Sequence, residues 1–274
     1  RVSRGRSIAL LVIDGLSVSQ WKVIQRNLGT RSGRVYTLEE KNLFAWIPTL
    51  TSVSRQALLS GKLPLSISRL LHDTSREEKL WKNFWEDNDI VPEKVGYTKL
   101  KGDSEELDEV TELIEHPFQI ATIIVDKIDS VMHGQKQGSA MMHKEVQHWA
   151  DSDFLSELLD ILFHRYDDIF LTSDHGNDEA VGIGSLSQGS LVKEKGQRCR
   201  IYNSSQFRKE AQELSADSIS WPQIGLPENY YPLLAPFGKA FTREETTVVT
   251  HGGASIDEVI VPFIRFSREG RGYE

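Results

Sequence analysis

Cysteine is almost absent from this chain, since Cys199 is the single thiol among 274 residues. One thiol excludes an internal disulfide framework, and we interpret Cys199 as a small, semi-buried residue. No apolar run approaches the roughly 18 residues that a membrane-spanning helix needs. No signal-peptide pattern is present, because the basic start at residues 1–6 leads directly into an apolar run. These absences are typical of a reduced, cytoplasmic setting, and we expect no membrane partner.

Positive charge is also in deficit, with 32 Lys and Arg against 40 Asp and Glu and a formal net charge of −8. This balance argues against non-specific nucleic-acid binding through overall charge, although two bound divalent cations would make a pocket locally positive. Neither internal repeats nor low-complexity segments are visible. The first residue is Arg and not Met, so we expect a domain cut from a longer polypeptide, with residues 1–274 forming one α/β domain.

Apolar runs alternate with helical patterns along the chain. We expect strands at residues 8–13, 43–47, 95–100, 121–125, 168–172, 199–202 and 259–266. The longest helical pattern covers residues 141–165, and residues 218–241 lack periodicity and are interpreted as an irregular cap or insertion. Strands that alternate with helices indicate an α/β fold with a mostly parallel sheet sandwiched between helices.

Metal-binding residue types recur where these strands end. Asp14 ends the run at residues 8–13, and Asp174 and His175 end the run at residues 168–172. Asp129 and His133 are spaced to converge on one ion from a loop or a helical turn after another strand. In parallel sheets ligands bind at the carboxyl ends of the strands. An ordinary turn would explain any one of these segments, but together they indicate a metal site.

His251 opens a His-Gly-Gly-Ala-Ser turn and is the third candidate histidine. Three aspartates and three histidines are enough for two metal sites, which is typical of a two-metal hydrolase. Asp126 competes with Asp129 as a ligand; we prefer Asp129 for its shorter spacing to His133. The remaining histidines have no such context and are interpreted as surface or core residues.

Thr51 is the candidate nucleophile, in the segment Pro-Thr-Leu-Thr-Ser-Val-Ser-Arg. It would lie at a helix N-terminus, where the helix dipole favours anions; the simpler interpretation is a helix cap. A threonine hydroxyl is a poor nucleophile until a metal lowers its pKa. Ser54 and Arg55 follow as candidate substrate-binding residues, with a solvated helix position as the alternative for Arg55.

Taken together, these motifs resemble the alkaline phosphatase superfamily over nearly the whole chain. The segments Leu-Leu-Val-Ile-Asp-Gly-Leu, Pro-Thr-Leu-Thr-Ser-Val-Ser-Arg, Thr-Ser-Asp-His-Gly-Asn, Arg-Cys-Arg-Ile-Tyr and Thr-His-Gly-Gly-Ala-Ser resemble more closely the PglZ domain of BREX phage-defence systems. Thr51 aligns with the threonine of the Pro-Thr-Lys-Thr pattern in the phosphodiesterase branch, but Ser54 replaces that branch's Asn. A threonine cannot become formylglycine, which argues against a sulfatase.

The resemblance implies two metal ions and a mechanism. One ion would take Asp14, Asp174 and His175, and the other Asp129, His133 and His251, with Thr51 between them as nucleophile and metal ligand. The ligand types suit Zn²⁺ first and Mn²⁺ as the alternative. The implied function is a phosphodiesterase or nuclease-like phosphohydrolase that acts on nucleic acid or nucleotide diesters, with other defence proteins as partners.

Two alternatives stay open on the sequence alone. One is a non-catalytic scaffold that keeps the metal-site fold within a multi-protein defence complex; a full ligand set favours chemistry instead. The other is a phosphomonoesterase or mutase, which would call for more phosphate-binding cations. The nearby candidates for that role are Arg55, Lys127, Arg198 and Arg200.

Overall fold

A computed structural model describes residues 5–31, 36–71, 74–134, 138–186 and 196–268. Its central feature is a six-stranded sheet in the order β2-β12-β5-β1-β4-β3. These strands are β1 (Ile8–Ile13), β2 (Tyr36–Phe44), β3 (Val95–Leu100), β4 (Ile120–Val125), β5 (Asp168–Thr172) and β12 (Ile260–Arg268). β1, β3, β4 and β5 are parallel, and β12 runs antiparallel to both β2 and β5. The expected α/β fold with a mostly parallel sheet is confirmed.

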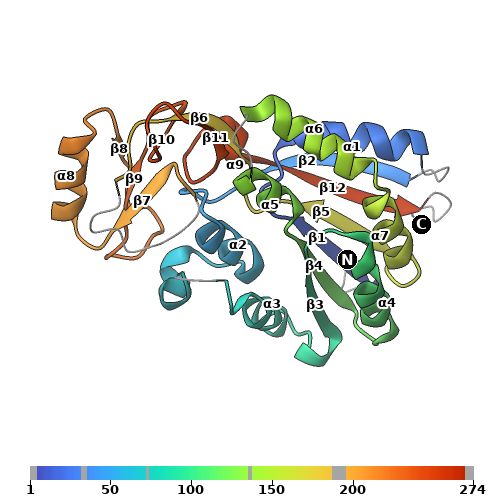
Figure 1. Cartoon of the computed structure of the whole chain (residues 1–274). Helices are drawn as coiled ribbons and strands as arrows, with labels where there is room; N and C mark the ends of the chain where they lie inside the picture. The colour runs from blue at the N-terminus through green and yellow to red at the C-terminus, as the bar shows by residue number, and fades with distance from the viewer. Residues whose placement is uncertain (1–4, 32–35, 72–73, 135–137, 187–195, 269–274) are drawn as a thin grey trace.

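Helices cover both faces of this sheet (Figure 1). Leu11, Ile13 and Ile123 point into a core with α1 (Val18–Arg31), α4 (Leu107–Glu115), α6 (Gly138–Ala150) and α7 (Phe154–Phe163). Val12 and Ile124 point to the opposite face, against α2 (Thr51–Ser60) and α3 (Glu77–Glu86). Both faces of β1 and β4 are therefore apolar, which explains why their sequences read as continuous apolar runs.

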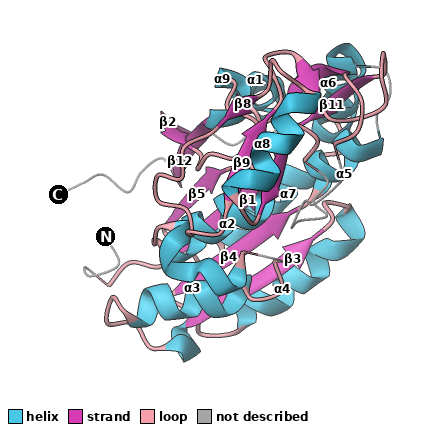
Figure 2. Cartoon of the chain, turned by 90° about the vertical axis from the view of Figure 1, so that its left-hand side faces the viewer, coloured by secondary structure: helices cyan, strands magenta, loops and turns pink. Residues whose placement is uncertain are grey.

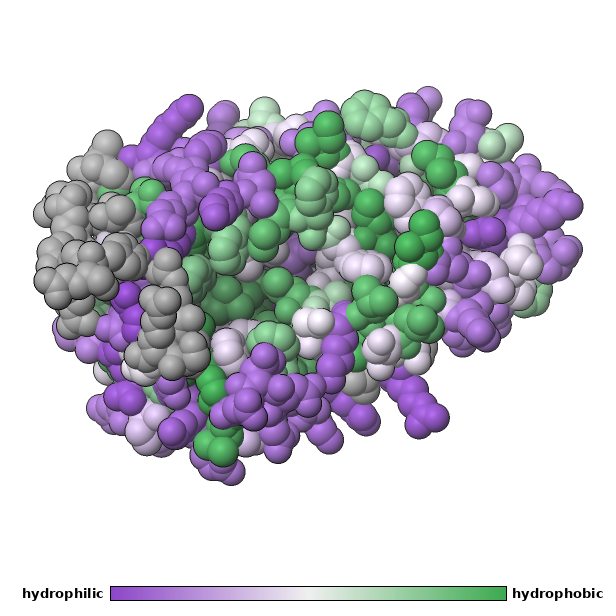
Figure 3. All heavy atoms as spheres, turned by 180° about the vertical axis from the view of Figure 1, so that it is seen from behind, coloured by the Kyte–Doolittle hydropathy of each residue, from purple (hydrophilic) through white to green (hydrophobic). Residues whose placement is uncertain are grey.

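Part of the second face is open. Viewed from behind, apolar side chains gather around a hollow in the middle of the molecule (Figure 3). On this face of the sheet, a cavity of about 300 Å³ is lined by residues of β2, α2 and β12 and by Ser173 and Asp174 after β5. The sheet floor beside α2 is thus partly exposed.

Two small three-stranded sheets extend the fold beyond one end of the central sheet (Figure 1), and in the view from that end α8, β8 and β9 lie in front of it (Figure 2). The first pairs β6 (Asp178–Gly182) with β10 (Lys239–Ala240) and β11 (Thr247–Thr250), and the second pairs β9 (Tyr231–Leu234) with β7 (Cys199–Tyr202) and β8 (Ile219–Ser220). α8 (Ser205–Leu214) packs on the second sheet. Residues 218–241, which we expected to be irregular, contain the three short strands β8, β9 and β10; that they form an insertion stays a prediction.

Short helices complete the chain. They are η2 (Pro64–Leu70), η3 (Pro92–Lys94), η4 (Ser104–Glu106), α5 (Lys127–Gly134) and α9 (Ile256–Val259). No helix among the described residues is long and apolar enough to cross a bilayer.

Two further predictions were wrong in their boundaries. The long helix expected over residues 141–165 is two helices, α6 and α7, separated at Asp153, whose φ of 63° a right-handed helix cannot contain. The strand expected at residues 43–47 lies earlier, in β2. β2 can carry polar residues because it lies at the edge of the sheet. Glu39 accepts a hydrogen bond from Arg265 of β12, and Glu40 accepts one from Lys22 of α1. Charged edge strands resist pairing with other chains.

Candidate metal centre and nucleophile

One cluster of metal-binding side chains lies at the carboxyl ends of β1 and β5. Asp14, Asp174 and His175 are buried, and one ligand atom from each lies within 4.8 Å of the others. His175 Nε2 is 3.6 Å from Asp14 Oδ1 and 3.9 Å from Asp174 Oδ2. The other ring nitrogen, Nδ1, is 2.9 Å from the carbonyl of Gly176. A proton on Nδ1 would satisfy that carbonyl and leave the Nε2 lone pair for a cation.

Close backbone packing positions this first cluster. Gly15 turns the chain after β1 with a φ of 77°, and its N–H donates to Asp174 Oδ1 at 3.3 Å. At Gly176 a Cβ atom would lie 1.9 Å from the carbonyl oxygen of Asp257. Glycine is therefore required at position 176, directly after the two ligands that end β5.

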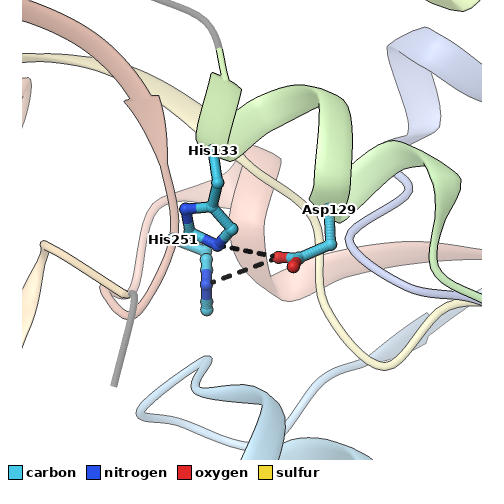
Figure 4. Close-up of side chains that lie close together, drawn as sticks. All are labelled: Asp129, His133 and His251. Atoms are coloured by element: carbon cyan, nitrogen blue, oxygen red, sulfur yellow. Dashed lines mark ion pairs between the residues drawn. The ribbon is translucent and has the colours of Figure 1, made fainter. Parts of the chain in front are cut away.

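A second cluster joins α5 to the turn after β11 (Figure 4). Asp129 and His133 are four residues apart on α5, so they share one helix face. His133 Nε2 lies 3.1 Å from Asp129 Oδ1, and His251 Nε2 lies 3.8 Å from the same oxygen. The His251 ring stacks on the His175 ring at a centroid distance of 4.1 Å, so the two clusters adjoin.

Both clusters contain buried polar atoms that make no hydrogen bond. They are Asp14 Oδ1, Asp174 Oδ2, Asp129 Oδ1 and His133 Nε2. Buried polar groups normally find a partner, and each exception calls for an explanation. Carboxylate oxygens and imidazole nitrogens that converge in this way fit a divalent cation of the Zn²⁺ or Mn²⁺ type. The residues present therefore fit two metal ions, one in each cluster.

The electrostatics of the first cluster are those of crowded carboxylates. Burial, and then the neighbouring charge of Asp14, raises the pKa of Asp174 to about 7. For His175, burial acts to lower the pKa, but Asp174 and Asp14 outweigh it and raise the pKa. In the second cluster, burial and the adjacent His175 lower the pKa of His251, which keeps that ring neutral.

Thr51 is the first residue of α2, and its hydroxyl oxygen lies 2.9 Å from His175 Nε2. The N-terminus of a helix carries positive partial charge, which favours an anion beside this hydroxyl. The side chain of Thr51 is not the cap of α2, because Leu50 occupies the N-cap position and makes no side-chain cap hydrogen bond. A hydroxyl oxygen therefore lies directly beside the first cluster.

Arg55 and Ser54 both have protein partners. The Arg55 guanidinium is buried, 2.5 Å from Asp14 Oδ2 and 2.6 Å from Glu77 Oε1. The interpretation of Arg55 as a solvated helix residue was therefore wrong. Ser54 is also buried, and its hydroxyl accepts a hydrogen bond from the N–H of Trp46 at 2.9 Å. Contact of either side chain with a substrate stays a prediction, and this geometry does not favour it.

Asp126 lies next to the first cluster but outside both groups. Its Oδ1 is 3.8 Å from the Arg55 guanidinium, and its Oδ2 is 3.1 Å from Lys99. Burial, followed by the charge of Asp14, raises its pKa. The structure thus groups Asp129, rather than Asp126, with His133 and His251.

Sequence reasoning missed three supporting residues. Glu77 bridges Arg55 and the Tyr97 hydroxyl, which donates to it at 2.9 Å. Thr49 and Glu258 bind the turn that carries His251. Glu258 could have been noticed as the last residue of a Ser-x-x-Glu capping box at α9, but only as a helix cap. Glu77 and Thr49 carry no comparable local signal.

The fold and the paired clusters define an alkaline phosphatase-like protein, with six side chains able to bind metal and a threonine hydroxyl at the carboxyl edge of the sheet. The chain belongs to the family described as the BREX system PglZ alkaline phosphatase-like domain, whose model matches residues 1–266. None of the curated proteins compared with the chain matches it.

Solved structures share this fold at low sequence identity. Human ectonucleotide pyrophosphatase/phosphodiesterase 5 has a TM-score of 0.65 at 13% identity, over 96% of this chain and 88% of its own. The murine enzyme, in an inactive form with one threonine replaced by alanine and in complex with AMP, has a TM-score of 0.63 at 13% identity, over 95% and 87%. Phosphonoacetate hydrolase from Sinorhizobium meliloti 1021, in complex with phosphonoformate, has a TM-score of 0.51 at 14% identity, over 95% and 89%.

Proposed function

We propose that this chain is a metal-dependent phosphodiesterase of a bacterial phage-defence system, with Thr51 as its nucleophile. The observation that carries the proposal is the position of the Thr51 hydroxyl, 2.9 Å from His175 Nε2 and beside two adjoining clusters of metal-binding side chains. The murine structural neighbour supports it, since its inactive form carries a threonine-to-alanine substitution and binds AMP. Family membership supports the setting in phage defence and other defence proteins as partners.

In this proposal Asp14, Asp174 and His175 hold one divalent cation together with Thr51, and Asp129, His133 and His251 hold the other. When bound, such cations lower the pKa of a neighbouring hydroxyl and neutralise phosphoryl oxygens. Zn²⁺ suits these ligands first, and Mn²⁺ is the alternative.

The chain's own residues then perform an in-line phosphoryl transfer. Thr51 Oγ1 attacks phosphorus, the bond from phosphorus to the departing oxygen breaks, and the hydroxyl proton of Thr51 leaves with the departing alcohol. The product is a phosphothreonine ester that keeps the second ester group of the substrate, and in a second step water hydrolyses the bond to Thr51, which releases a phosphomonoester and regenerates the hydroxyl. The α2 N-terminus stabilises the phosphoryl oxygens during both steps. Arg55 neutralises Asp14 and Asp174, at 2.5 Å and 3.8 Å, which keeps the first cluster assembled.

The test is hydrolysis of bis-p-nitrophenyl phosphate and p-nitrophenyl phosphate by the chelated protein, before and after Zn²⁺ or Mn²⁺ is restored. We expect diester turnover that needs metal and that Thr51→Ala lowers on the order of 10³-fold or more. Thr111→Ala, on α4 and remote from both clusters, is the matched control and should retain full activity.

Each other result assigns a different function. A preference for the monoester would make the protein a phosphomonoesterase. Metal binding without turnover of either compound would favour the scaffold function, in which the clusters serve assembly. Equal turnover by wild type and Thr51→Ala would exclude Thr51 as nucleophile.

A further inference from the structure

Thr49, two residues before Thr51, is completely buried and binds the His251 turn at three points. Its carbonyl oxygen lies 2.8 Å from His251 Nδ1. Its hydroxyl accepts a hydrogen bond from the N–H of Gly252 at 3.0 Å and donates to the carbonyl of Gly253 at 2.9 Å. One residue of the nucleophile segment therefore uses its backbone and its side chain to hold the turn that presents a metal-binding histidine.

The same turn is held from its other side by Glu258. Its Oε1 accepts from the N–H of Gly253 at 2.7 Å, and its Oε2 accepts from the N–H of Ser255 at 3.0 Å. Glu258 is fully buried, and its charge is balanced by Arg198, whose guanidinium lies 3.2 Å away. Arg198 is held in turn by Asp178 at 2.8 Å. The backbone carbonyl of Glu258 also accepts from the N–H of Gly176 at 2.8 Å, whereas its carboxylate is directed at the His251 turn.

We propose that Thr49 is a positioning residue that sets the His251 ring and the Thr51 hydroxyl in one fixed relation. The carbonyl of Thr49 accepts the Nδ1 proton of His251, so the Nε2 lone pair points towards Asp129. The hydroxyl binds the two glycines that follow His251 and so helps Glu258 to fix the turn. Thr49 thereby ties the nucleophile segment to the second cluster, whereas Asp14, Asp174 and His175 of the first cluster follow β1 and β5. This inference rests on the proposed function only for its effect on turnover.

Thr49→Val removes the hydroxyl and keeps the shape and the carbonyl. We expect the affinity for Zn²⁺ to fall about 10-fold in one of two sites, the lower end of the loss seen when an outer partner of a metal ligand is removed, because the carbonyl that holds His251 Nδ1 stays while the turn that carries His251 loses two hydrogen bonds. Equilibrium dialysis at a fixed free Zn²⁺ concentration should give two ions for the wild type and one for the variant. Turnover of bis-p-nitrophenyl phosphate should fall through kcat more than through KM, because the Thr51 hydroxyl, which faces the substrate, is still present. Thr49→Ser should restore both properties.

Thr122→Val is the matched control, because Thr122 is equally buried and its hydroxyl makes no hydrogen bond. It should retain two ions and full turnover. If Thr49→Val fails to fold, Glu258→Gln tests the same turn, and a one-site loss of Zn²⁺ is again expected. Unchanged Zn²⁺ stoichiometry and affinity in folded Thr49→Val, equal weakening of both sites, or no recovery in Thr49→Ser would each overturn the proposal. Zn²⁺ binding is measured directly. A wild type that binds two ions but does not hydrolyse the diester would therefore refute the proposed function and would leave the proposal for Thr49 standing.

Discussion

Removal of the Arg55 side chain is expected to lower the stability of the fold, because its guanidinium lies among four carboxylates in the interior. It contacts Asp14 and Glu77 at 2.5 Å and 2.6 Å, and it lies 3.8 Å from both Asp126 and Asp174. Burial alone would lower the pKa of Arg55, but Asp14, Asp174 and Glu77 outweigh it and raise the pKa. Arg55→Met keeps the volume and removes the positive charge.

The expected loss follows from the burial of both partners. The side chains of Arg55 and Glu77 are each 2% exposed, so Glu77 would be left as a buried charge without compensation. Breaking a buried ion pair in this way costs about 3–5 kcal/mol. At about 2 °C per kcal/mol for a chain of this size, the melting temperature should fall by roughly 6–10 °C in the metal-free protein. Saturating Zn²⁺ should recover part of the loss, because a cation neutralises Asp14 and Asp174 but not Glu77.

Thermal unfolding by circular dichroism in EDTA and in Zn²⁺ checks this expectation. Arg55→Met/Glu77→Gln should recover about half of the loss in EDTA, since it removes the orphaned charge. Lys62→Met breaks the exposed pair with Asp87, whose side chain is 57% exposed, and should change stability by less than about 1 kcal/mol. A melting temperature for Arg55→Met within about 2 °C of wild type in EDTA would refute the reasoning, as would a double variant less stable than the single one.

Three further outcomes are expected. Removal of Zn²⁺ by a chelator should lower the melting temperature, since a ligand present at 100 times its Kd stabilises the folded state by about 2.7 kcal/mol per site. Identical melting curves with and without Zn²⁺ would argue against metal sites. Burial and Asp14 raise the pKa of Asp174 to about 7, above the roughly 3.9 of an aspartate in an unfolded chain, so the metal-free protein loses stability as the pH rises through this interval. Asp174→Asn should therefore exceed wild type in stability in EDTA at pH 8, with an advantage that shrinks as the pH falls below about 7 and is lost by about pH 4; an advantage that is constant with pH would contradict this assignment. Gly176→Ala would place a Cβ atom 1.9 Å from a backbone oxygen, so we expect lower thermal stability and loss of Zn²⁺ binding in dialysis; a variant with wild-type Zn²⁺ affinity would show that the backbone can move aside.

The local pattern of the chain was enough to predict the strand ends and the groups that follow them. β1, β3, β5 and β7 have the predicted boundaries; for the central strand β1 the reason is that a strand covered on both faces reads as an unbroken apolar run. Asp14, Asp174 and His175 could be predicted to meet, since parallel strands end at a common edge. The bounds of the edge strand β2 could not be predicted, because its polar residues pair with β12 and α1, which are remote in sequence.

What the sequence by itself determined is therefore the alternation of strands and helices, the residues able to bind metal, and the threonine beside them. Only the tertiary structure decided that His251, which follows β11 of a separate small sheet, stacks on His175. It also decided that Asp129, rather than Asp126, lies in one cluster with His133 and His251. It also decided that Arg55 is a buried counter-ion of Asp14. These facts depend on long-range packing and on the balance of buried charge, which arise only when segments distant in the chain are brought together.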